Sequence, residues 1–239
     1  MPLKRLRSIA AYFADGLHLI FPDNCLACGG HLRYSERILC TACLLDIPLV
    51  RLTGSEDDSF EQLFIGQIPY ERVAAFFYYT KKNKYANLMH ELKYKGNQRA
   101  GVFLGELFGN QLKTTEFIHD IDCIVPVPLH AKRKRARGYN QSEILAQGIA
   151  NSTSLPICAN AVERSVNTET QTKKNKEERK HNVANIFTVT NHHLLQGKHI
   201  LLLDDVITTG ATTISCAETI FNQVENVRIS IAGVALASN

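Results

Sequence analysis

Short apolar runs recur along the chain and predict β-strands. Several of these runs are apolar at successive positions, which is typical of strands that a parallel sheet buries on both faces. The predicted strands are Val73–Tyr79, Cys123–Val127, Ile186–Val189, His199–Leu203 and Val227–Leu236.

Between these runs, apolar residues recur at the spacing of an α-helix with one buried face. The positions are Leu88 and Leu92 for one helix; Val102, Leu104, Leu107, Phe108 and Leu112 for the next; Ile144, Leu145 and Ile149 for a third; and Ile214, Ala217 and Phe221 for a fourth. Strands that alternate with helices predict an α/β fold, with a mainly parallel sheet flanked by helices and with ligands at the carboxyl ends of the strands.

Composition limits the number of domains. A chain of 239 residues with 45% hydrophobic and 21% charged side chains can bury one sizeable core and a small appendage. We expect a helix and cysteine finger over 1–50, a polar linker over 51–70 and the α/β domain over 71–239. The amphipathic start, LKRLRSIAAYF, could dock to a partner or an anionic membrane surface, but we expect it to pack on the finger.

The longest apolar stretches are too short or too interrupted for a transmembrane helix, so we expect a cytoplasmic protein without an integral membrane span. The chain has neither a G-x-x-x-x-G-K-[ST] nor a G-x-G-x-x-G motif, which argues against a P-loop ATPase. The net charge of +4 is mild, so the position of the cations matters more than their sum.

Four of the seven cysteines are spaced C-x2-C-x11-C-x2-C, and they are Cys25, Cys28, Cys40 and Cys43. Two such pairs can surround one zinc ion, and four thiolates leave no open position for chemistry, so we expect a structural Zn2+ site. The alternatives are a redox motif or buried structural thiols. His31 is expected to be exposed and not a ligand. The other cysteines, Cys123, Cys158 and Cys216, lie in apolar contexts typical of the core.

The stretch LLLDDVITTGATT places Asp204 and Asp205 after an apolar strand and before a turn of small hydroxyl residues that opens a helix. Backbone N–H groups, threonine hydroxyls and the positive end of the helix dipole suit a phosphate. The acids can accept hydrogen bonds from two ribose hydroxyls. The stretch therefore predicts a site for a ribose 5-phosphate, and the alternative is an ordinary capped helix with solvated acids.

A basic run follows the strand at Cys123–Val127 and contains Lys132, Arg133, Lys134, Arg135 and Arg137. Such a run by itself is most often a solvated surface. Because it lies beside the predicted phosphate site, it could instead bind a diphosphate or the backbone of a nucleic acid.

These motifs together resemble a known family. LLLDDVITTGAT is similar to the phosphoribosyl-pyrophosphate (PRPP) motif of type I phosphoribosyltransferases. With the cysteine finger, LKYKG, VPVPLHAKRKRARGYNQ, RSVNTETQ and ERKHNVANIF, the chain resembles the ComF (ComFC, GntX-like) family, which is associated with DNA uptake in natural competence. It departs from that pattern at Ala131, where proline is usual, and at Tyr139, where phenylalanine is common.

The resemblance implies a type I phosphoribosyltransferase-like sheet that binds PRPP together with Mg2+. It implies a catalytic role for Asp204, Asp205 and Arg179, with Arg164 and Asn182 as further candidates. The implied PRPP-binding residues are Asp204, Asp205, Val206, Thr208, Thr209, Gly210, Ala211, Thr212, Pro128, Leu129, Arg133, Arg137 and Lys93. Lys93 and Lys95 of LKYKG could equally be the usual lysines of a helix C-terminus.

The long polar segment SVNTETQTKKNKEERKHN corresponds, by the same resemblance, to a loop that closes over PRPP and excludes water. In related enzymes a small hood near the N-terminus recognises the base, and the finger occupies that end here. We therefore expect the finger to pack against the core beside the site.

Three functions remain open from the sequence. The first is a ComF-like protein that handles incoming single-stranded DNA, has other DNA-uptake proteins as partners, and carries a PRPP pocket. The basic run from Lys132 to Arg137 would bind the DNA. The second is an active Mg2+-dependent phosphoribosyltransferase with an unidentified acceptor. The third is a structural adaptor in which both sites are remnants, against which the intact DDVITTGAT motif argues.

Overall fold

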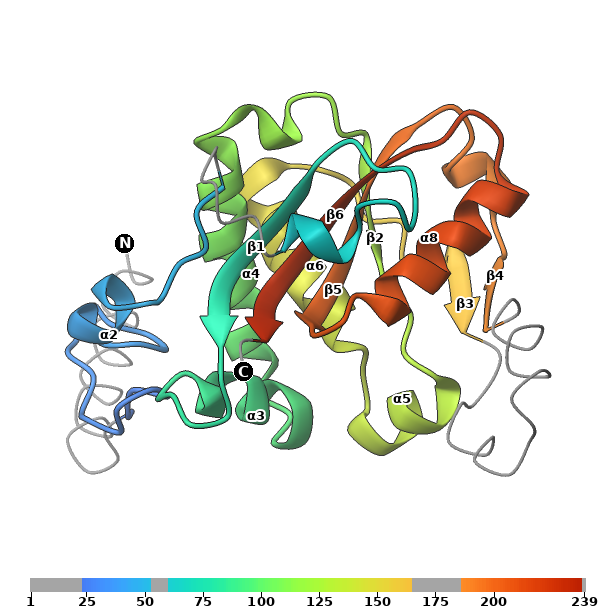
Figure 1. Ribbon diagram of the computed structural model, residues 1–239. Coiled ribbons are helices and arrows are strands. Elements are labelled where there is room, and N and C mark those ends of the chain that lie inside the picture. The colour runs from blue at the N-terminus through green and yellow to red at the C-terminus, as the bar shows by residue number, and fades with distance from the viewer. Residues whose placement is uncertain (1–22, 53–59, 165–185, 238–239) are drawn as a thin grey trace, which may run out of the picture.

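A computed structural model describes residues 23–52, 60–164 and 186–237. Its centre is a parallel sheet with the strand order β1-β6-β5-β2 (Figure 1). The strands are β1 (Val73–Tyr79), β2 (Cys123–Pro126), β5 (His199–Ile207) and β6 (Arg228–Ala237). The predicted α/β fold with a parallel sheet flanked by helices is confirmed.

Both faces of the sheet are buried, because alternate residues of β5 join different clusters of the core. Leu201 and Leu203 pack with α3 (Ala86–Tyr94), α4 (Gln98–Lys113) and α6 (Gln141–Thr153). Ile200 and Leu202 pack with α8 (Ala211–Gln223), which crosses the opposite face in front of the sheet in Figure 1. No helix within the described residues is long and apolar enough to cross a bilayer.

Helices α4 and α6 approach each other closely through glycines. A Cβ on Gly105 would lie 2.2 Å from the Leu145 carbonyl oxygen, and one on Gly148 would lie 2.1 Å from the Val102 carbonyl oxygen. A larger side chain at either position would push the helices apart. This contact holds the α6 N-terminus, and therefore the residues just before it, in a set position against the sheet.

A second, two-stranded sheet pairs β3 (Val162–Arg164) with β4 (Phe187–Val189) in antiparallel fashion. The predicted strand at Ile186–Val189 therefore exists, but it lies outside the main sheet. Its partner β3 has only three residues, which is too short for a periodic signal. The chain between them, 165–185, lies outside the described residues.

The cysteine finger (residues 23–45), with its short helix α2 (Thr41–Leu45), joins the sheet at its β1 edge. The chain that leaves the finger runs antiparallel to β1: the N–H of Val50 donates to the Phe76 carbonyl at 2.9 Å, and that of Tyr78 donates to the Pro48 carbonyl at 2.8 Å. The finger is thus tied to the core by backbone hydrogen bonds.

Part of the segment that the sequence predicts as a linker packs into the core. Phe60, Phe64 and Ile68 are buried, around a short 3-10 turn at Glu61–Leu63. The Phe64 ring lies directly beneath Gly210, where an added Cβ would be 3.2 Å from it. Residues 60–68 therefore support the turn after β5. Residues 53–59 lie outside the described residues.

Candidate functional site

A cavity of about 200 Å³ opens at the carboxyl ends of β5 and β2, at the lower edge of the sheet in Figure 1. Acidic side chains from β5 line one part of it and cationic side chains from three other elements line the rest. The lining residues are Lys93, Val127, Pro128, Leu129, Arg133, Arg137, Asn140, Gln141, Ser142, Arg164, Asp204, Asp205, Val206 and Thr212.

The two acids lie inside β5, which continues through them to Ile207 and not, as predicted, only to Leu203. Successive strand residues point to opposite faces, so the two carboxylates contact different helices. Asp204 accepts a hydrogen bond from the Thr213 hydroxyl of α8 at 3.2 Å. Asp205 forms an ion pair with Lys93 at the end of α3, with 2.8 Å between Nζ and Oδ2. Both carboxylates still line the same cavity.

Burial raises the pKa of Asp204 from 3.8 to about 7, and the neighbouring charge of Asp205 adds to the increase. The Asp205 N–H, the Thr213 hydroxyl and Lys93 oppose this effect. Near neutral pH, Asp204 can therefore exist with or without a proton, whereas Asp205 faces a cation. The two acids of the motif are adjacent in the sequence but have different chemical environments, which the sequence alone does not reveal.

The turn after β5 leads directly into α8. Gly210 has a φ of 73° and precedes the first helical residue, and no side chain caps the helix start within the described part of the chain. The amide N–H groups of the first turn are thus available to an anion. Thr212 lines the cavity, while Thr208, Thr209 and Ala211 are exposed at its rim and do not line it.

The basic run forms a helix, α5 (Ala131–Arg137), which the apolar pattern did not predict because the segment has no apolar face. His130 caps it by accepting a hydrogen bond from the Lys132 N–H. Arg133 and Arg137 are four residues apart, share one face of the helix and line the cavity with Pro128 and Leu129 of the preceding loop.

The other cations of α5 do not line the cavity. Lys134 forms an ion pair with Glu143 of α6 at 3.0 Å. Lys132 and Arg135 are exposed. Helix geometry therefore divides the predicted run into a part that faces the cavity and a part that faces solvent.

The motif residues GYNQ, at 138–141, lie between α5 and the start of α6, and the sequence predicted no role in the site for them. Asn140 caps α6 by accepting from the Ser142 N–H, and its amide donates to the Val127 carbonyl at 3.0 Å. Gln141 accepts from Arg137 at 2.8 Å, and the Tyr139 hydroxyl donates to the Leu92 carbonyl. The signal was an asparagine directly before a helical pattern, which is a preferred capping residue.

Arg164, at the end of β3, also lines the cavity, and its guanidinium lies 5.4 Å from the centre of the Phe187 ring. Burial lowers the pKa of Arg164, and the nearby Arg133 lowers it further. The other two residues that the sequence placed near the closing loop, Arg179 and Asn182, lie outside the described residues.

The four clustered cysteines bring their Sγ atoms within 4.8 Å of one another. Such a set of sulfur donors, which comes from two tight pairs and has no other ligand type, suits a tetrahedral zinc ion. Glu36 holds the loop between the pairs, because its carboxylate accepts from the N–H groups of Arg33 and Thr41, each at 2.7 Å. These hydrogen bonds lower the pKa of Glu36 to about 2. The residues therefore fit a structural metal site. His31 is exposed and contacts Asn24, as expected for a non-ligand.

Helix α3 connects the finger with the cavity. At its start, the Tyr85 hydroxyl donates to the Cys43 carbonyl and the Asn87 amide donates to the Leu26 carbonyl, each at 2.8 Å. At its end, Lys93 reaches the cavity. The finger packs against the core, as expected, but among the described residues none of the finger lines this cavity, because it contacts the opposite end of α3.

No protein-family profile matches the chain. It is similar to Competence protein F of Haemophilus influenzae, with 27% identity over 203 residues, 80% of this chain and 88% of that protein. It is 32% identical to the DNA utilization protein YhgH of Escherichia coli over 134 residues, 55% of this chain and little more than half (58%) of YhgH. Competence protein ComFC of Bacillus subtilis is 35% identical over 89 residues, 37% of this chain and 34% of ComFC.

Solved structures resemble the chain only weakly. The glutamine PRPP amidotransferase of B. subtilis superposes with a TM-score of 0.38 and 16% identity over 55% of this chain and 26% of that one. The adenine phosphoribosyltransferase of Leishmania tarentolae gives a TM-score of 0.34 and 13% identity over 79% of this chain and 94% of that one.

We expect Cys40→Ser to lower the zinc content of the purified protein and its Tm, because one of four converging thiolates is lost. Structural zinc sites of this kind have apparent binding free energies of about 10–16 kcal/mol. Elemental analysis and thermal unfolding measure both effects. Cys158→Ala, which removes a thiol outside the cluster, should leave the zinc content unchanged. Equal zinc in Cys40→Ser and the wild type would contradict the assignment.

We expect Asp204→Asn to stabilise the ligand-free protein at pH 8 but not at pH 4. The pKa of Asp204 is raised in the folded state, so the folded chain keeps a proton that the unfolded chain releases, and this group lowers the free energy of unfolding as pH rises from about 4 to about 7. Thermal unfolding across that range tests it. The exposed Glu225→Gln is the control and should show no comparable trend. A variant less stable than the wild type at pH 8 would rule out the raised pKa.

Proposed function

We propose that this chain, which is similar to competence and DNA-utilization proteins, belongs to their family, handles single-stranded DNA and binds a phosphoribosyl diphosphate in the cavity at the end of β5. The observation that carries the proposal is the division of this cavity, with two carboxylates on β5 and the cations Lys93, Arg133 and Arg137 around them. A ribose ring whose hydroxyl groups lie next to a diphosphate has the complementary chemistry.

In this proposal each side chain has a distinct task. Asp205, which is paired with Lys93, accepts a hydrogen bond from a ribose hydroxyl. Asp204, whose pKa is raised to about 7, can accept or donate toward a second hydroxyl. The turn from Thr208 to Thr212 binds the 5-phosphate through the free N–H groups that open α8.

The cations hold the diphosphate. Arg133 and Arg137 project from one face of α5, and a guanidinium can bind phosphate oxygens through two parallel hydrogen bonds. Gln141 accepts from Arg137 at 2.8 Å and orients it. Mg2+ would enter with the diphosphate and neutralise part of its charge. Positioning and charge neutralisation of this kind would also suit a transferase, in which no side chain acts as a nucleophile.

Titration calorimetry of PRPP with Mg2+ into the zinc-loaded protein tests the ligand. We expect micromolar binding, about −8 kcal/mol. Asp205→Asn and Arg137→Gln should both weaken it, because the first removes a carboxylate and the second a guanidinium from the lining of the cavity. Asp46→Asn, far from the cavity on an exposed site, is the matched control. Absence of binding by the wild type would overturn this part of the proposal. A transferase would in addition release pyrophosphate from PRPP in the presence of its acceptor.

Single-stranded DNA would contact the outer face of α5. The slope of log affinity against log salt concentration should become shallower by about 1.4 in the double variant Lys132→Gln/Arg135→Gln. The reason is that each phosphate contact on a single strand contributes about 0.7 to this slope. Fluorescence anisotropy with a labelled oligonucleotide measures this. The control is Arg51→Gln/Lys113→Gln, with the same loss of charge at exposed positions outside α5. Equal slopes in the two double variants would exclude α5 as the contact.

A further inference from the structure

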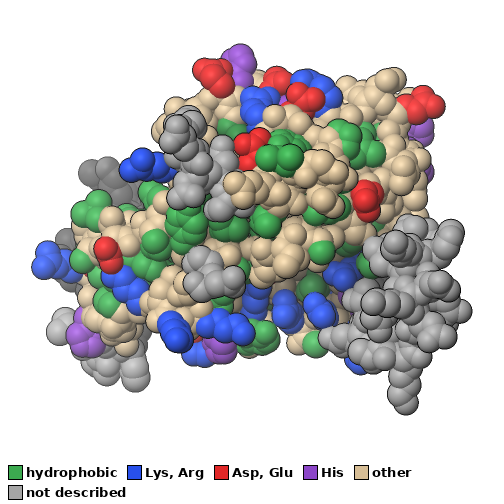
Figure 2. Space-filling view, in the orientation of Figure 1, with side chains coloured by type: hydrophobic (Ala, Val, Ile, Leu, Met, Phe, Trp, Pro, Cys, Tyr) green, Lys and Arg blue, Asp and Glu red, His purple; other side chains and the backbone are tan. Residues whose placement is uncertain are grey.

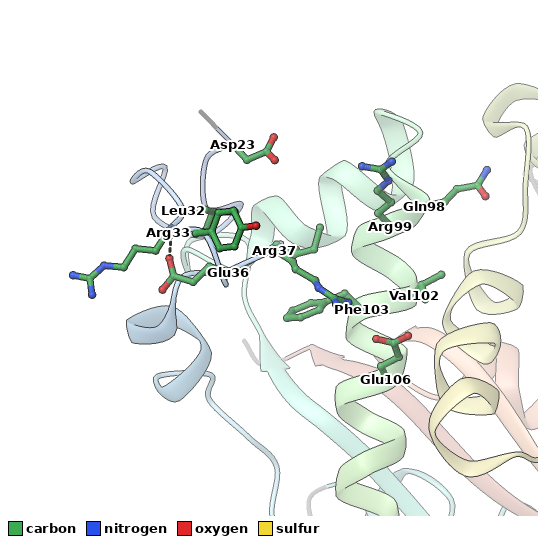
Figure 3. Close-up of a pocket in the computed structure, with 12 residues that line it drawn as sticks. Asp23, Leu32, Arg33, Glu36, Arg37, Gln98, Arg99, Val102, Phe103 and Glu106 are labelled. Carbon is green, nitrogen blue, oxygen red and sulfur yellow. Dashed lines mark hydrogen bonds between the residues drawn. The ribbon is translucent and has the colours of Figure 1, made fainter. Parts of the chain in front are cut away.

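A larger cavity, of about 610 Å³, lies between the cysteine finger and α4 (Figure 3). This volume is within the range of about 300–1,000 Å³ that is usual for ligand sites. It is separate from the cavity at the end of β5, and none of its lining residues is shared with that cavity. Neither the phosphoribosyl site nor the metal cluster accounts for it.

The cavity combines apolar surface with arginines. Val102 and Phe103 of α4 are half-buried and form its wall, and Leu32 and Ile38 of the finger face them. Figure 3 shows Arg37 extending from the finger toward Phe103, while Arg33 points away from α4. An aromatic ring beside guanidinium groups suits a planar base joined to a phosphate.

The charges lining the cavity are three arginines and three acids, and each of the acids has a partner in the protein. Glu36 accepts from the backbone of its own loop, and Glu106 accepts from the Asn151 amide at 3.1 Å. Within the described residues, neither Arg37 nor Arg99 has a carboxylate within ion-pair distance. Arg37 and Arg99 are therefore available to an anionic ligand.

The end of α3 lies between this cavity and α5. Arg99, at the start of α4, follows the turn Lys95–Asn97 at the end of α3, and Tyr94 in the last turn of α3 is 67% exposed. The Arg137 guanidinium lies 5.3 Å from the centre of the Tyr94 ring, and the His90 ring lies 5.2 Å from it. Figure 2 shows Lys and Arg side chains spread along this lower edge of the molecule.

We propose that the cavity between the finger and α4 receives a nucleotide of single-stranded nucleic acid whose backbone runs over Tyr94 and Lys95 to α5. This proposal rests on the proposed binding of single-stranded DNA by α5. It adds a second binding site at the cavity and an aromatic residue, Tyr94, between the cavity and α5. Arg37 and Arg99 bind the phosphate at the cavity, and Phe103 contacts the base. Tyr94 stacks with a base on the way, where Lys95, already paired with Glu91 at 2.8 Å, lies beside the backbone.

A single strand fits this surface better than a duplex does. The wall of the cavity is a half-buried aromatic side chain, and only a base that is free of a partner strand can turn toward it. Cationic and aromatic side chains also alternate along this path, which is the arrangement by which proteins bind single strands without reading their sequence. A free nucleotide would have the same chemistry as one unit of the strand, so the test must separate these sources.

Fluorescence anisotropy with oligothymidylates of about 4 to 16 nucleotides, and competition by free thymidine monophosphate, make this distinction. We expect Arg37→Gln/Arg99→Gln to weaken the longer oligonucleotides and to remove about 1.4 from their salt slope, while the shortest ones bind as to the wild type through α5. Tyr94→Leu should weaken binding by about 5-fold to 150-fold, the effect of one lost stacking contact. Tyr94→Phe should retain most of the affinity.

The controls distinguish the second binding site from the proposed binding of single-stranded DNA by α5. Arg51→Gln/Lys113→Gln carries the same charge change elsewhere and should leave the length dependence intact. If the wild type binds and the α5 variant binds less, while the cavity and Tyr94 variants match the wild type, the second site is overturned and the proposed function stands. Failure of the wild type to bind any oligonucleotide overturns both. Equal affinity for thymidine monophosphate and the long oligonucleotides overturns the continuous path.

Discussion

Burial of β5 on both faces is the constraint from which the candidate site follows. From Ile200 to Leu203 every side chain of the strand is apolar and buried, between α4 and α6 on one side and α8 on the other. A polar group in that span would lose its water without a partner. Polar chemistry can begin only where the covering helices end, at Asp204, and the same is true of β2 at Pro126. The parallel arrangement brings both of these ends to one edge.

At that edge the two acids are made different by the layers on either side of them. Asp204 turns toward α8, where a threonine hydroxyl is its partner, and its pKa rises to about 7. Asp205 turns toward α3, where a lysine balances its charge. Two adjacent acids thereby differ: Asp204 can carry a proton near neutral pH, whereas Asp205 is paired with a lysine.

Helix α3 links the parts of the molecule that a reader of the sequence would treat as separate. Its first residues hold the finger through Leu26 and Cys43, and its last residues supply Lys93 to the site and Tyr94 to the surface. The Tyr139 hydroxyl donates a hydrogen bond to the Leu92 carbonyl and so joins the same helix to the start of α6. One short helix thus sets the positions of the finger, of Lys93 and of Arg137.

The helical period sorts the basic run in a way that composition cannot. Five cations in six positions would be one patch on an extended chain. On α5, Arg133 and Arg137 share the face toward the cavity, Lys134 is paired with Glu143, and Lys132 and Arg135 face solvent. In the proposed function, this one segment would contact a diphosphate on one face and a nucleic-acid backbone on the other.

The sequence alone determined the features that local pattern encodes. Strand and helix periods predicted β1, β2, β5, β6 and the helices α3, α4, α6 and α8, and the spacing of the cysteines predicted their cluster. Asp204 and Asp205 were identified because their chemistry follows directly from the strand before them. Only the tertiary structure decided that residues 60–68 pack beneath the turn at Gly210, that β4 pairs outside the main sheet, and that the finger lies at the far end of α3 from the cavity. The physical reason is that periodicity reports which face of an element is buried, whereas the partner that buries it, and the direction in which a polar side chain is then left to point, depend on contacts between residues far apart in the chain.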